Sequence, residues 1–119
     1  MKRILFFSVP LLVALNLFAK EVYIDPGPNA QERLQEALIL IEEGDTLIIK
    51  NGYYKLEDGL SLDVDNVTVK GEGIDSTILD FKNQQSGAQG LLVTSDRVTL
   101  SDFSILDAKG DALKVIGAK

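Results

Sequence analysis

The chain has 119 residues, a formal net charge of −6, and neither cysteine nor histidine. The acidic balance argues against nucleic-acid binding and against attraction to anionic lipid by charge alone. The two missing residue types exclude a disulfide framework, a histidine metal site and a histidine general base from these residues.

The first nineteen residues have the features of a secretory leader. Lys2 and Arg3 precede an apolar run from Ile4 to Phe18, and the small residue Ala19 follows. The run is 15 residues long, whereas a membrane-spanning helix needs about 20. We expect cleavage after Ala19, which leaves Lys20 to Lys119 in the periplasm or outside the cell, with no membrane span. Retention of the leader as a membrane anchor is the alternative.

One amphipathic helix is predicted over residues 30–43. It follows a β-prone segment at 21–25 and a Pro-Gly-Pro turn, which neither a strand nor a helix can continue. Asn29 and Glu32 have the spacing of a capping box, and Gly44 is suited to end the helix. The apolar residues recur at the i, i+3, i+4 and i+7 positions of one helical face, namely Leu34, Ala37, Leu38 and Ile41.

From residue 45 onward the pattern changes to short β-prone segments separated by Gly, Asn, Asp and Lys. They lie at 46–49, 60–62, 67–69, 77–79, 91–93, 98–100, 104–106 and 113–116. No second helical stripe appears among them, so alternating strand–helix units are not expected.

These segments repeat along the chain. Shifts of 31, 27 and 22 residues superpose similar segments, respectively 59–69 on 90–100, 77–80 on 104–107 and 91–93 on 113–115. Self-similarity at such a period predicts stacked coils, each built from three short strands. The turn at 81–89 is long in the first repeat and short in the next.

The repeat therefore predicts an all-β solenoid. Coils about 4.8 Å apart would place like side chains in ladders pointing into the core. The expected ladders are Leu60/Leu91/Leu113, Leu62/Val93/Val115 and Val67/Val98. The helix is placed to cover the open edge of the first coil. We accordingly divide the chain into a leader (1–19), a strand with the capping helix (20–44) and a coil region (45–119); a small β-sandwich with one helix is the alternative.

Several motifs resemble the start of the pectin-lyase-like family. They are Glu43-Gly44-Asp45-Thr46-Leu47-Ile48-Ile49 after the helix, Asn51-Gly52-Tyr53-Tyr54, Val67-Thr68-Val69-Lys70-Gly71-Glu72-Gly73 and Thr77-Ile78-Leu79-Asp80. More narrowly, the chain is similar to exported parallel β-helix repeat proteins of bacteria. The resemblance implies a right-handed parallel β-helix over nearly the whole mature chain. The family contains pectate lyases, polygalacturonases, alginate epimerases and carbohydrate-binding surface proteins, whose active sites usually lie on later coils, so no catalytic residue is carried over.

Two groups of acidic residues are candidates for chemistry. The 27-residue shift would stack Asp80 on Asp107, about 4.8 Å apart, where they could share a Ca²⁺ ion or act as an acid. Asp63 and Asp65 form a second acidic edge. The alternative for both groups is that they are solvated turn residues.

Other candidate residues are less specific. A lyase would need a cationic base, and the available residues are Lys70, Lys82, Arg97, Lys109 and Lys114, none of which the spacing selects. Adjacent residues of a strand face opposite sides, so one of Tyr53 and Tyr54 should lie in the core and the other should be exposed. A structural role is expected for the exposed ring, and stacking on a sugar is the alternative. We expect no cofactor; Ca²⁺ held by Asp80 and Asp107 is the alternative.

Taken together, the sequence predicts the first two to three coils of an exported scaffold that binds a glycan or an envelope protein. No catalytic site is assigned within it. The alternative is part of a polysaccharide lyase, hydrolase or epimerase whose active coils lie beyond Lys119. The last coil stops where its next inward strand should begin, so we expect a chain that is truncated in mid-coil and self-associates through this edge.

Overall fold

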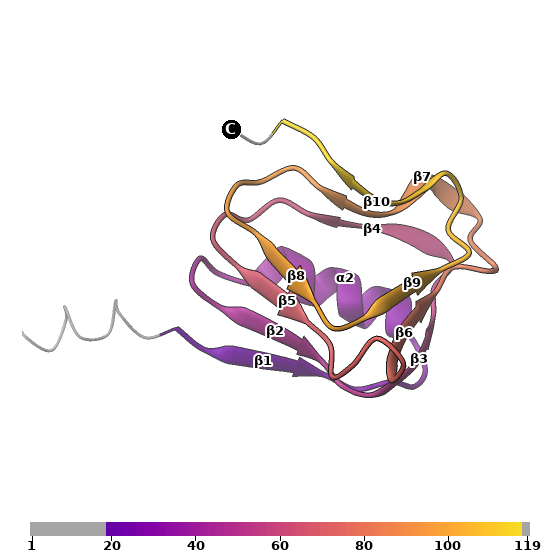
Figure 1. Cartoon of the computed structure of the whole chain (residues 1–119), viewed down its shortest axis with the longest axis horizontal. Coiled ribbons are helices and arrows are strands. Elements are labelled where there is room, and N and C mark those ends of the chain that lie inside the picture. The colour runs from indigo at the N-terminus through magenta and orange to yellow at the C-terminus, as the bar shows by residue number, and fades with distance from the viewer. Residues whose placement is uncertain (1–18, 118–119) are drawn as a thin grey trace, which may run out of the picture.

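The computed structural model describes residues 19–117, which form ten strands and one helix (Figure 1). The predicted leader, apart from Ala19, lies outside the described residues. The elements are β1 (Glu21–Ile24), α2 (Ala30–Leu40), β2 (Thr46–Ile49), β3 (Gly52–Lys55), β4 (Asp58–Leu62), β5 (Thr68–Lys70), β6 (Thr77–Asp80), β7 (Ser86–Val93), β8 (Thr99–Ser101), β9 (Ser104–Leu106) and β10 (Asp111–Val115).

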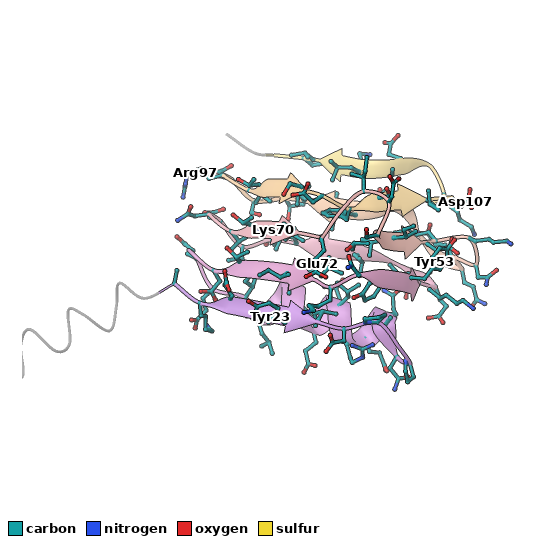
Figure 2. The ribbon with its side chains drawn as sticks, turned by 60° about the horizontal axis from the view of Figure 1, so that its bottom comes forward. Tyr23, Tyr53, Lys70, Glu72, Arg97 and Asp107 are labelled. Atoms are coloured by element: carbon teal, nitrogen blue, oxygen red, sulfur yellow. The ribbon has the colours of Figure 1, made fainter. Side chains whose placement is uncertain are left out.

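The strands form three parallel sheets that the chain visits in turn. Sheet A has the order β1-β2-β5-β8, sheet B the order β3-β6-β9, and sheet C the order β4-β7-β10. After α2 the chain passes through A, B and C three times, and each passage, here called a coil, pairs with the previous one in parallel. Figure 2 shows the strands stacked from β1 at the bottom to β10 at the top. The parallel pairing rules out the sandwich alternative, because sandwich sheets are antiparallel.

Two of the predicted apolar ladders are confirmed in sheet C. Leu91 pairs with both Leu60 and Leu113, and Val93 pairs with both Leu62 and Val115. The members from the first two coils are buried in the core, while Leu113 and Val115 of the third coil are exposed. The third expected ladder follows from sheet A, where Thr68 pairs with Thr99 and thereby sets Val67 beside Val98.

The predicted register of sheet B is wrong by one residue. The pairs are Ile78 with Ser104, Leu79 with Ile105, and Asp80 with Leu106, so the shift is 26 rather than 27 residues. The core decides this register, because Leu79 is fully buried and Ile105 packs against the same cluster. A slip of one residue would turn every side chain of β9 to the opposite face.

The helix is shorter than predicted, and its first turn differs from the capping-box prediction. Asn29 has a left-handed backbone (φ 60°) and makes no side-chain capping bond. The helix ends at Leu40 because Ile41 is extended, which turns its side chain into the core. Gly44 is therefore not the helix stop; its N–H donates to the carbonyl of Asn66, 2.7 Å away.

The helix covers the open edge of the first coil, as predicted. Leu34 and Leu38 are buried in the same core cluster as the inward residues of the strands. Two helical glutamines also bond to the exposed edge of β4. Gln31 Oε1 accepts from the N–H groups of Glu57 and Asp58, and Gln35 bonds both the N–H (2.9 Å) and the carbonyl (3.1 Å) of Ser61. The helix thus satisfies edge groups that would otherwise invite another strand.

Candidate functional site

A polar groove of about 480 Å³ lies along the outer side of sheet B, where β3 and β6 end. We call it the sheet B groove. In Figure 2 two of its residues, Tyr53 and Asp107, lie at the right-hand end of the stack, far from Arg97 at the left. The groove is lined by Tyr53, Lys55, Leu56, Glu57, Asp80, Lys82, Asn83 and Asp107.

The alternation of β3 decides which side chains reach the groove. Tyr53 and Lys55 face outward, whereas Tyr54 between them is fully buried. This confirms the prediction that one tyrosine is core and the other exposed. Tyr53 is 51% exposed, so its ring is available to a ligand. Lys55 pairs directly with Asp80 of β6, which sets opposite charges side by side on the groove wall.

The electrostatics of the groove hold the hydroxyl of Tyr53 in its neutral form. The nearby negative charge of Asp80, partial burial, a hydrogen bond with the Asp80 side chain and the charge of Asp107 all raise the pKa of Tyr53. At neutral pH the groove therefore combines a neutral phenol with carboxylates that accept hydrogen bonds.

Asp80 and Asp107 line the same groove, but they do not stack as the sequence predicted. Leu106 occupies the position opposite Asp80, and Asp107 follows it with a left-handed backbone. Asp80 instead accepts a hydrogen bond from the N–H of Lys82, 2.9 Å away, within its own turn. Within residues 19–117 no group of three or more acidic side chains is placed to hold a metal ion. A shared Ca²⁺, which takes six to eight oxygen ligands, was the alternative for this pair, and the register that prompted it is wrong.

The second acidic pair belongs to a stacked turn between sheets C and A. Asp63 accepts a hydrogen bond from the hydroxyl of Thr94 (2.8 Å), and Asp65 accepts one from the N–H of Asp96 (2.8 Å). Both carboxylates thus tie one coil to the next, in agreement with the turn alternative.

Of the five candidate bases, Lys82 alone lines the groove. Lys70 ends β5 in sheet A, Arg97 lies in a turn, Lys109 precedes β10, and Lys114 lies on β10. Lys55 and Asn83 also line the groove but were not predicted from the sequence. Lys55 could have been predicted, because residues two apart on a strand lie on the same face and Lys55 therefore shares the face of Tyr53.

No protein-family model, curated protein or solved structure matches this chain. Within residues 19–117, no helix is both long enough and apolar enough to cross a bilayer.

Proposed function

We propose that this chain is part of an exported, right-handed parallel β-helix that binds a glycan in the sheet B groove. The observation that carries the proposal is the exposed ring of Tyr53 beside carboxylates, lysines and an amide in one groove. The right-handed winding is supported by the three parallel sheets visited in a fixed order, since about 98% of parallel crossover connections are right-handed. Export is supported by the leader features of residues 1–19.

The groove has the chemistry that a sugar ring requires. An aromatic face offers apolar contact to the C–H side of a pyranose, and Tyr53 presents such a face. Asp80, Asp107 and Asn83 offer acceptors and donors for hydroxyl groups around it.

The charges of the groove favour a neutral glycan over a polyuronate. Three carboxylates, from Glu57, Asp80 and Asp107, face two ammonium groups, from Lys55 and Lys82. A chain of uronic acids would bring further negative charge to a wall that already has an excess of it. We therefore propose a neutral, hydroxyl-rich polysaccharide as the ligand class.

The test is binding of neutral oligosaccharides to the processed protein, measured by calorimetry with oligogalacturonate as the charged comparison. Tyr53→Ala should weaken binding of the neutral ligand at least tenfold, which corresponds to about 1.4 kcal/mol. The matched control is Tyr23→Ala, because Tyr23 is similarly exposed (53% against 51%) but lies on β1 in sheet A. Equal loss in both variants, or no binding by the wild type, would contradict the assignment of the groove.

An enzyme of the same fold is the second candidate, because Asp80 and Asp107 share one groove. Paired carboxylates of this kind serve glycoside hydrolysis when they flank the scissile bond. The same oligosaccharides should then be shortened during incubation, and chromatography of the products would show it. Intact ligand after prolonged incubation favours the scaffold.

A further inference from the structure

The carboxylate of Asp45 is buried against the first residue that follows the predicted leader. Asp45 is only 3% exposed, and its oxygens accept three hydrogen bonds. They come from the backbone nitrogen of Lys20 (3.1 Å), the Nζ of Lys20 (3.0 Å) and the N–H of Glu42 (3.0 Å). Lys20 is further held by its carbonyl, which accepts from the N–H of Thr46 at 3.0 Å. Lys20 thus extends sheet A by one residue, with its backbone nitrogen directed at a buried anion.

The side-chain cation that pairs with this anion is the ammonium of Lys20. Burial by itself would raise the pKa of Asp45, but the hydrogen bonds from Lys20 and Glu42 outweigh it and lower the pKa, so the group is ionised. The cation that faces it, Lys20 Nζ, is shared with Glu42 at 3.0 Å and belongs to a side chain that is 58% exposed. A cation in contact with a buried carboxylate interacts with it more strongly than one that is screened by water.

The peptide bond before Lys20 is accessible. Ala19 and Lys20 are both exposed and lie outside any helix or strand. Ala19 runs beside Gly44, where an added Cβ would lie 4.0 Å from the Ala19 Cβ. The nitrogen and the carbonyl of Lys20 are nevertheless held by hydrogen bonds, to Asp45 and Thr46.

We propose that cleavage of the Ala19–Lys20 bond creates an α-ammonium group on Lys20 that forms an ion pair with buried Asp45. Hydrolysis by a signal peptidase consumes one water molecule, leaves a carboxylate on Ala19 and gives Lys20 an N-terminal ammonium. In the folded chain this nitrogen lies 3.1 Å from Asp45 Oδ1, so the ammonium takes the place of the amide donor. Processing therefore stabilises the fold, because a neutral N–H donor becomes a cation. The inference rests on the export of the chain, not on its glycan binding.

The pH dependence follows from the groups around the pair. The charges acting on it are Lys20 Nζ and Glu42, while Asp25, Arg33 and Glu36 line the same surface groove between β1 and α2. An α-ammonium whose pKa is raised by Asp45 stabilises the fold below its usual range of about 7.7–8.0 and loses this effect as the pH rises through the raised value. Asp45, whose pKa is lowered, contributes above about pH 4 and loses its effect as the pH falls through the lowered value. The gain from processing is thus largest between these limits.

The experiment begins with the full chain, exported with its leader from a bacterial host, and with the intact mass of the product. A mature protein that starts at Lys20 is expected, and any other N-terminus would overturn the proposal. The α-ammonium of Lys20, labelled with ¹⁵N-lysine, is then titrated by NMR. We expect its pKa to lie above about 8.0 and to return to the usual range in Asp45→Asn. An ordinary pKa in the wild type would refute the ion pair, and Glu42→Gln serves as the control that leaves Asp45 in place.

A second variant keeps the test decisive if Asp45→Asn does not fold. One Ala inserted between Ala19 and Lys20 moves the new ammonium about 3.8 Å along the chain and makes the Lys20 nitrogen an amide again. Its melting temperature should be several degrees below that of the wild type at pH 6, and the gap should narrow by pH 10. Equal melting temperatures at pH 6 would overturn the proposal. Glycan binding measured on the same samples reports separately on the proposed function.

Discussion

At the scale of single residues, Tyr54 shows how one side chain ties the first coil together. Its ring is fully buried, and its hydroxyl lies 2.7 Å from the carbonyl of Lys50 and 3.1 Å from that of Ile24. The proton can be donated to one of these carbonyls at a time, and the shorter distance favours Lys50. The hydroxyl therefore links the end of β1 to the turn before β3.

The burial of Tyr54 makes the protein sensitive to alkali. Burial raises the pKa of Tyr54 to about 12. Because the folded protein holds this proton more tightly than the unfolded chain, the stabilisation is complete below about pH 10 and is lost as the pH rises towards 12. Tyr54→Phe should cost about 1 kcal/mol at pH 7, and its stability should fall less steeply above pH 10. Urea unfolding of both proteins across this range provides the measurement, and parallel pH profiles would contradict it.

The groove residues show what a single sequence can and cannot reveal at this scale. Tyr53 could be predicted as exposed, because alternation on a strand is local. The stacking of Asp80 on Asp107 could not be predicted correctly, because it depends on how many residues the turns between sheets A and B contain. The register is decided by the packing of Leu79 beside Ile105 of the next coil.

At the scale of elements, the capping helix contributes both apolar packing and edge hydrogen bonds. The apolar face of the helix could be predicted from the helical spacing of its apolar residues. The glutamines were not, because Gln31 and Gln35 look like ordinary solvated residues until β4 is known to lie beside them. The helix end was misjudged for a similar reason: Ile41 leaves the helix to fill the core, and no local signal at residues 41–43 shows this.

The apolar contact of the helix is tested by Leu38→Asp. Leu38 is 2% exposed, so the substitution buries an unpaired charge and should cost about 3 kcal/mol or more. Ile39→Asp is the matched control, because Ile39 lies next to it on the same helix but is 65% exposed. The control should cost about 1 kcal/mol or less. Thermal melting of both variants distinguishes the two sites, and equal losses would show that the helix does not close the first coil.

The edge hydrogen bonds are tested separately by Gln35→Ala. This change removes both bonds to Ser61 and should cost about 1–2 kcal/mol, reduced slightly by the better helix propensity of alanine. Glu36→Ala is the comparison, since Glu36 is the exposed neighbour, and it should change stability by about 0.5 kcal/mol or less. Hydrogen exchange of the Ser61 amide should accelerate in Gln35→Ala only. Unchanged protection of the Ser61 amide would show that Gln35 does not hold the edge of β4.

At the scale of the whole molecule, the two ends of the stack differ in how they are covered. The helix covers the first coil, whereas within residues 19–117 no element pairs with the outer edges of β8, β9 and β10. The third coil is accordingly less buried, with Leu113, Val115 and Ile116 each more than 40% exposed. The hydroxyl of Ser95, which is buried beneath this coil, has no hydrogen-bond partner among the described residues. Edges of this kind are templates for pairing with another strand.

We therefore expect residues 20–119, produced alone, to self-associate through the edge of the third coil. Sedimentation velocity should show species that grow with protein concentration. Val115→Lys should shift the distribution towards the monomer, because a lysine on an edge strand opposes pairing and Val115 is 56% exposed on β10. Ile74→Lys is the control, since Ile74 is 62% exposed but lies in a turn between β5 and β6. If Ile74→Lys has the same effect as Val115→Lys, association is driven by general surface hydrophobicity; a monomeric wild type at every concentration would show that the edge does not pair at all.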